Sequence, residues 1–147
     1  MSKIANEVTI LLADDDAGHR QLMRRNLKRF KIANDIIEFE DGQGLLDFFR
    51  KAQDSGALAR MAFVVFLDIR MPRMTGVEVL QELKADPYLK RVPVIMVTTT
   101  DDPAEVTRCH ELGCSNYVTK PVDYDNFVKA IQNLGLFLSV VQVPRLD

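Results

Sequence analysis

Residues 63–76 read FVVFLDIRMPRMTG, in which five consecutive apolar residues run directly into Asp68. A short apolar run bounded by turn residues is typical of a β-strand that is buried on both faces of a sheet. Asp68 is therefore expected at the carboxyl end of a central strand, the edge of an open α/β sheet at which ligands bind. A helix cap is the alternative role for this aspartate, but Thr75 and Gly76 lie closer to the next helix.

Strand and helix patterns alternate five times along the chain. The apolar runs that predict strands cover residues 8–13, 35–40, 63–68, 92–98 and 116–119. Apolar residues at helical spacing follow each run. In the first helix they are Leu22, Met23, Leu27 and Phe30, and in the last, which Asp123 caps, they are Phe127, Ile131, Leu134 and Leu138. This alternation predicts a parallel sheet with helices on both faces.

Polar residues follow four of the predicted strands. Because crossovers between parallel strands are right-handed, the carboxyl ends of these strands meet at one edge of the sheet. Residues that are far apart in sequence should therefore converge there. A set of unrelated turn and cap residues is the alternative, and the match at four strand ends argues against it. The converging residues are Asp14, Asp15, Asp16, Asp68, Thr98 and Lys120.

This set of side chains is suited to a metal ion and a phosphoryl group. Neighbouring carboxylates repel one another and raise each other's pKa, which a divalent cation relieves. Carboxylate and carbonyl oxygens are the ligands of Mg²⁺, which keeps several waters. A lysine and a threonine hydroxyl beside the metal would offset the charge of phosphoryl oxygens. Asp68 would then be a nucleophile that forms an aspartyl phosphate.

Composition limits the other possibilities. The chain has 147 residues, 47% hydrophobic and 27% charged, with a formal net charge of −2, and is expected to form one domain over residues 1–147. The net charge is not basic, so it does not favour a nucleic-acid partner. No apolar run approaches the ~20 residues of a membrane span. Residues 1–7 lack a signal-peptide pattern, so we expect a cytoplasmic protein in which Cys109 and Cys114 are reduced and bind no metal.

Four motifs in this order resemble the receiver domain of two-component response regulators. They are LLADD at residues 11–15, LDIRMP at 67–72 with Gly76, VT at 97–98 and YVTKP at 117–121. Each motif is weak alone, but the ordered set is specific and spans nearly all of the chain. The resemblance implies a flavodoxin-like (βα)5 fold, with a five-stranded parallel sheet in the order 2-1-3-4-5.

The resemblance also implies roles at the site. Asp68 would be the phosphoacceptor and a ligand of Mg²⁺. Asp15 would bind this metal directly, Asp14 through water, and Arg70 through its backbone carbonyl. Asp16, Arg70 and Thr99 are departures from the common pattern, and such positions tend to set how long the phosphorylated state lasts.

A second group of residues would read out the phosphorylated state. Lys120 would pair with the phosphoryl group and Thr98 would hydrogen-bond to it. Tyr117 would swing inward when Thr98 moves, which alters the face formed by the fourth helix, fifth strand and fifth helix. The Lys120–Pro121 peptide would be cis, as in the family.

The resemblance is greatest to stand-alone receivers that serve phytochrome-type histidine kinases, so we expect such a kinase as the phosphodonor. The chain would be a phosphoacceptor and not an enzyme. Its fifth helix begins near Asp123, which leaves too little chain for an output domain. Its output would pass to a downstream protein or a phosphotransfer partner.

Two other functions are considered. Phosphatases that resemble haloacid dehalogenases carry Asp-x-Asp after their first strand, whereas residues 68–70 read Asp-Ile-Arg after the third. A pseudo-receiver that acts only as an adaptor would not need the full set of acidic, hydroxyl and lysine residues.

His19 is expected to be an exposed residue of the first helical turn rather than a phosphodonor, and His110 a surface residue.

A C-terminal extension begins at about residue 135. Residues 135–143 read GLFLSVVQV, and Leu136, Phe137, Val140 and Val143 find no partner within one predicted monomer. A contiguous exposed apolar patch is unusual in a monomer. We therefore expect a two-fold homodimer through the fourth helix, fifth strand, fifth helix and this extension. The alternative is an extension that folds back over its own core.

Overall fold

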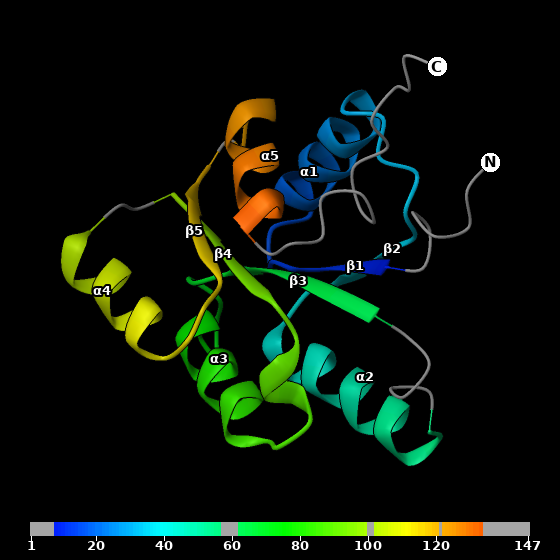
Figure 1. Ribbon diagram of the computed structural model, residues 1–147, viewed down its shortest axis with the longest axis vertical. Helices are drawn as coiled ribbons and strands as arrows, with labels where there is room; N and C mark the ends of the chain where they lie inside the picture. The colour runs from blue at the N-terminus through cyan, green and yellow to red at the C-terminus, as the bar shows by residue number, and fades with distance from the viewer. Residues whose placement is uncertain (1–7, 57–61, 100–101, 121, 134–147) are drawn as a thin grey trace.

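The computed structural model describes residues 8–56, 62–99, 102–120 and 122–133 (Figure 1). Its strands are β1 (Val8–Ala13), β2 (Ile36–Phe39), β3 (Ala62–Asp68), β4 (Val94–Thr98) and β5 (Asn116–Thr119). They form one parallel sheet in the order β2-β1-β3-β4-β5, which confirms the predicted flavodoxin-like fold. The helices are α1 (Ala17–Arg29), α2 (Gly42–Asp54), α3 (Gly76–Ala85), α4 (Pro103–Glu111) and α5 (Tyr124–Asn133), with a 3-10 helix η2 (Leu89–Arg91) before β4.

Helices cover both faces of the sheet, α1 and α5 on one face and α2, α3 and α4 on the other (Figure 1). The central strand β3 shows why its sequence does not alternate. Val64 and Phe66 lie in the core under α1 and α5, while Val65 and Leu67 lie in the core under the other three helices. Both faces of the strand exclude water, so both sets of positions are apolar.

Short polar side chains cap the starts of three helices. The Asp16 carboxylate accepts a hydrogen bond from the His19 amide at the start of α1, and Asp41 accepts one from Gly44 at the start of α2. Thr75 and Glu78 form a reciprocal capping box at the start of α3. The alternative in which Asp68 caps this helix is therefore wrong, and its carboxylate is available for the site.

Some sequence-based details need correction. Leu22 was expected on the buried face of α1, but it is 42% exposed. The helix packs through Met23, Leu27 and Phe30, at the spacing i, i+4 and i+7, and Leu22 lies about 100° around the helix from Met23. The predicted second and fourth strands begin later, at Ile36 and Val94.

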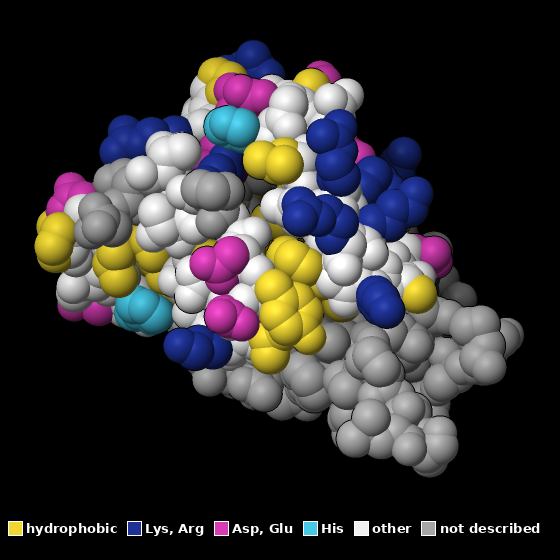
Figure 2. All heavy atoms as spheres, turned by 90° about the horizontal axis from the view of Figure 1, so that it is seen from above, with side chains coloured by type: hydrophobic (Ala, Val, Ile, Leu, Met, Phe, Trp, Pro, Cys, Tyr) yellow, Lys and Arg dark blue, Asp and Glu magenta, His cyan; other side chains and the backbone are white. Residues whose placement is uncertain are grey.

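The outer face of α1 is basic. Arg24, Arg25, Lys28 and Arg29 are exposed along it. Figure 2 looks onto the α1 and α5 side of the molecule, where Lys and Arg side chains gather beside a group of hydrophobic ones. Within the described residues, no helix is long and apolar enough to cross a membrane. Leu134, Leu138, Pro121 and the extension from about residue 135 lie outside the described residues, so the predictions made for them stay predictions.

Candidate functional site

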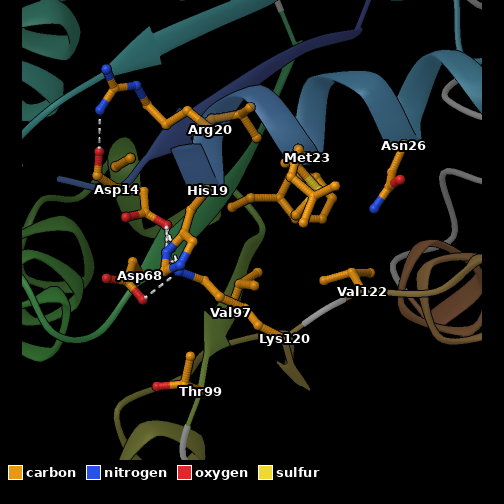
Figure 3. A pocket seen from close by; sticks show the side chains of 14 residues that line it. Asp14, His19, Arg20, Met23, Asn26, Asp68, Val97, Thr99, Lys120 and Val122 are labelled. Atoms are coloured by element: carbon orange, nitrogen blue, oxygen red, sulfur yellow. Dashed lines mark hydrogen bonds and ion pairs between the residues drawn. The ribbon is translucent and has the colours of Figure 1, made fainter. Parts of the chain in front are cut away.

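The polar strand ends meet at one edge of the sheet, as the crossover argument predicts (Figure 3). Asp14 follows β1, Asp68 ends β3, Thr98 ends β4 and Lys120 follows β5. Figure 3 shows the side chains of Asp14, Asp68 and Lys120 turned toward one another. Asp14, Asp68 and Thr98 are the polar residues buried at this edge. The site therefore combines charge with limited access to water.

Three carboxylates form the acidic part of the site. One oxygen each of Asp14, Asp15 and Asp68 lies within 4.8 Å of the others. Asp14 and Asp68 are buried and Asp15 is exposed, so the cluster opens to solvent on the Asp15 side. Among the residues the structure describes, this is the one group of three or more acidic, His or Cys side chains with this spacing. Cys109 and Cys114 are both buried and unpaired, in agreement with reduced thiols.

Lys120 supplies the positive charge of the site. Its ammonium lies 2.5 Å from Asp14 Oδ2 and 3.2 Å from Asp68 Oδ1. The Lys120 amide donates a hydrogen bond to the Thr98 carbonyl at 2.7 Å, which ties the lysine backbone to the end of β4. The lysine is thereby held over both buried carboxylates.

The backbone of Asp14 is braced from α1. Arg20 Nη1 donates to the Asp14 carbonyl at 2.7 Å, and Arg20 Nε donates to Glu38 at 3.0 Å. The Asp16 amide donates to Asp14 Oδ1 at 2.9 Å. These contacts place one Asp14 oxygen toward its own loop and leave the other beside Lys120.

Burial and, to a smaller extent, the charge of Asp14 together raise the pKa of Asp68 to about 6, against the opposing effect of Lys120. The carboxylate is thus ionised near neutral pH at an energetic cost. A cation placed between the carboxylates would remove much of this cost. The donor set is made of hard oxygen ligands without a thiolate or an imidazole among its three members, so it fits Mg²⁺ or a similar divalent cation.

The loop after Asp68 is shaped by Gly76. A side chain at this position would overlap the backbone carbonyl of Asp68, and the Gly76 amide donates to the Ile69 carbonyl at 2.8 Å. Arg70 lies in this loop, between Asp68 and Gly76, and is exposed. Arg70 and Asp15 line a hollow of about 470 Å³ on the open side of the carboxylate cluster. A carbonyl ligand from this loop is therefore compatible with the site.

The predicted switch residues lie behind the acceptor. Thr98 is fully buried, and Thr99 is exposed. Tyr117 pairs in register with Met96 of β4, two residues before the end of β5. Its side chain is half-buried and packs against the core under α2, α3 and α4. Tyr117 is therefore placed between the strand that ends in Thr98 and the helical layer that contains α4.

His19 is the residue that sequence reasoning left outside the site. Its side chain is 43% exposed, as expected, but its Nδ1 lies 2.9 Å from the Lys120 ammonium. Helical side chains lean toward the N-terminus of their helix, so a residue of the first turn of α1 leans toward the loop that holds Asp14. The position of His19 in the first helical turn was therefore the sequence signal that it could lie near the site. The lysine 101 positions away could not be inferred from it.

A mostly apolar cavity of about 330 Å³ adjoins the site. Asp14, Asp68 and Lys120 lie at its charged end (Figure 3). Its apolar wall is made of side chains from α1, the sheet and the segment before α5, namely Leu12, Leu22, Met23, Phe66, Val97 and Val122. Leu22 is thus exposed to this cavity and not packed in the core.

The model of the response regulator receiver domain family matches residues 10–132. This chain belongs to the response regulator receiver domain family. The receiver domain is 31% identical to the response regulator Rcp1 of Synechocystis, over 92% of each chain. A structure of Rcp1 in its Mn²⁺-bound form has a TM-score of 0.66, at 29% identity over 95% of this chain and 98% of that one.

Two other solved receiver structures are similar over almost their full length. A receiver domain from Rhodospirillum rubrum is 45% identical, with 92% and 96% of the two chains covered and a TM-score of 0.73. The bacteriophytochrome response regulator AtBRR is 33% identical, with 95% and 96% covered and a TM-score of 0.75. The predicted relationship to receivers of the phytochrome type is therefore confirmed at the level of structural neighbours.

Proposed function

We propose that Asp68 of this receiver domain accepts a phosphoryl group from a histidine kinase, with Mg²⁺ bound at the carboxylate cluster. The observation that carries the proposal is the placement of a buried carboxylate 3.2 Å from an ammonium and within 4.8 Å of two further carboxylates. Asp14, Asp15, Asp68 and the Arg70 carbonyl are the proposed ligands. The bound metal would supply positive charge for the phosphoryl oxygens.

The proposed step is an in-line displacement at phosphorus. An Asp68 oxygen forms the new P–O bond while the P–N bond to the donor histidine breaks. The electron pair of that bond stays on the imidazole nitrogen, which then takes a proton. Lys120 exchanges a carboxylate partner for a phosphoryl oxygen, and the Thr98 hydroxyl donates a hydrogen bond to another phosphoryl oxygen.

The proposed output is a change at the switch face, which we define as α4, β5 and α5. Thr98 ends β4, and its movement toward a phosphoryl oxygen would open space next to β5. Tyr117 on β5 would then turn inward from its half-buried position. Phosphorylation thus acts as a local charge change that biases a two-state element.

We propose that the protein is a single-domain cytoplasmic response regulator, and that a phytochrome-type histidine kinase donates its phosphoryl group. The similarity to Rcp1 and AtBRR over nearly their whole lengths supports this assignment. The protein would act as a phosphoacceptor that assists its own phosphorylation and dephosphorylation, without another substrate. Its signal would leave through a downstream protein or a phosphotransfer partner.

The test uses a small phosphodonor in place of the kinase. Incubation with acetyl phosphate and Mg²⁺ should add one phosphoryl group, measured by intact mass. A protein that stays unlabelled would refute the proposal and favour a pseudo-receiver adaptor. Turnover of a generic phosphomonoester would instead favour a phosphatase with an aspartyl nucleophile.

The metal site makes a separate prediction. Asp15→Ala should weaken Mg²⁺ binding at least about tenfold, because a charged ligand is lost from the open side of the cluster. Thr98→Ala should leave the affinity unchanged, since Thr98 is not a proposed ligand. Isothermal titration with MgCl₂ measures both. Equal affinities in the two variants would place the metal elsewhere.

We also propose a homodimer through the switch face and the extension after α5. Light scattering should show a dimer at micromolar concentration, because the apolar side chains of the extension would be covered by the partner. Phe137→Glu should shift the protein toward monomer. Beryllofluoride, which imitates the phosphoryl group, should tighten or reorient the dimer through Tyr117. A wild-type protein that is monomeric with and without beryllofluoride would contradict this proposal.

A further inference from the structure

The His19 imidazole completes the set of neighbours around the Lys120 ammonium (Figure 3). Its Nδ1 lies 2.9 Å from Nζ, alongside the carboxylates of Asp14 at 2.5 Å and Asp68 at 3.2 Å. An ammonium has three donor hydrogens and no acceptor. Its three neighbours, one ring nitrogen and two carboxylates, match this number of hydrogens.

The donor rule also says which role the ring nitrogen takes in this contact. Because Lys120 can only donate, a hydrogen bond between the two residues needs Nδ1 of His19 as its acceptor, with the ring proton on Nε2. Nε2 lies 3.8 Å from Asp16 Oδ2, so the N–H end of the ring faces a carboxylate. The Asp16 carboxylate also accepts a hydrogen bond from the His19 amide at 3.1 Å. Asp16 thus fixes the backbone of His19 and faces the N–H end of its ring.

We propose that His19 is a positioning residue that keeps the Lys120 ammonium directed at Asp68 during phosphoryl transfer, an inference that rests on the proposed function. In that function Asp14 turns its charge to the metal, and Lys120 must exchange carboxylate partners for a phosphoryl oxygen. The imidazole can hold one ammonium hydrogen throughout this exchange. A ring nitrogen that accepts this hydrogen bond retains the direction of the lysine without competing, as a carboxylate would, for its charge.

The geometry explains why this acceptor comes from α1. Lys120 follows β5, and its side chain reaches across the sheet edge to Asp14 and Asp68. His19 contacts the lysine from α1. It lies in the first turn of this helix, which Asp16 caps and which Arg20 ties to the backbone of Asp14. The imidazole is therefore carried by a rigid element, while the long lysine side chain is flexible on its own.

The test compares three substitutions on α1. His19→Leu removes the acceptor, His19→Gln keeps an oxygen acceptor on a side chain of similar reach, and Gln21→Leu is the control at an exposed neighbouring position. The rate of labelling by acetyl phosphate at saturating Mg²⁺ should fall about tenfold in His19→Leu, the loss expected for one hydrogen bond to a charged group. His19→Gln should restore most of it, Gln21→Leu should match wild type, and the Mg²⁺ affinity should be unchanged in all three.

A second readout needs neither metal nor phosphoryl donor. In nitrogen NMR of the metal-free protein, the Nδ1 resonance of His19 should move when Lys120→Met removes the donor, and should stay in place in Gln21→Leu. Wild-type labelling rates in His19→Leu, or an Nδ1 resonance that ignores Lys120→Met, would overturn the inference. A wild-type protein that takes no phosphoryl group would refute the proposed function instead, and the two failures are therefore distinguishable.

Discussion

Asp68→Asn is expected to abolish phosphorylation by acetyl phosphate and Mg²⁺ while the protein remains folded. The carboxamide keeps the shape of the side chain but has no anionic oxygen to attack phosphorus. Asp14 cannot readily take its place, because its two oxygens contact the Asp16 amide and the Lys120 ammonium. Asp15 is exposed and lacks the buried setting next to Lys120. Intact mass should therefore show no added phosphoryl group in this variant.

A matched control is available at Asp47, an exposed carboxylate on α2. Asp47→Asn changes the net charge by the same amount and should be labelled like wild type. Labelling of Asp68→Asn at the wild-type level would move the acceptor to another aspartate. Peptide mapping of the labelled wild-type protein would then identify it.

In metal-free buffer, Asp68→Asn should also stabilise the protein at neutral pH by up to about 3 kcal/mol. Burial, with the charge of Asp14, raises the pKa of Asp68 from 3.8 to about 6, and this difference corresponds to about 3 kcal/mol. Between these two pH values the folded protein binds more protons at this carboxyl than the unfolded chain does. The contribution of Asp68 to stability is therefore fully present below about pH 4 and is lost as the pH rises through about 6.

Urea unfolding of wild type and Asp68→Asn in EDTA, at a series of pH values, measures this effect. The gap in the free energy of unfolding should widen from acid to neutral pH in favour of the variant. Saturating Mg²⁺ at neutral pH should close or reverse the gap, because it binds the folded wild-type site and not the unfolded chain. A gap that is independent of pH would show that Asp68 titrates in its ordinary range.

The parallel sheet and its helices followed from local patterns. The unalternating apolar run before Asp68 predicted a strand covered on both faces, and the residues Thr75 and Asp123 predicted where two of the helices begin. The handedness of crossovers then predicted that Asp14, Asp68 and Lys120 would converge. Each of these inferences depends on chain-local sterics or on a topological rule, both of which can be read from sequence order.

Strand and helix boundaries were less exact for a physical reason. The predicted strand at residues 92–98 starts at Val94, because residues 89–91 form a turn of 3-10 helix in front of it. Leu22 has the apolar character of a core residue, yet it borders the cavity beside the site. Whether an apolar side chain packs in the core depends on how the helix rotates against the sheet, and the spacing alone allowed two rotations.

The amino-acid sequence by itself determined the layered fold, the sheet edge that carries the site and the residue types that meet there. Only the tertiary structure decided the electrostatics of that edge. The raised pKa of Asp68 depends on its burial and on its separation from Asp14. The contact between His19 and Lys120 joins residues that are 101 positions apart, and it depends on how α1 lies beside the end of β5. Side-chain distances of this kind are set by packing between elements, which no local pattern encodes.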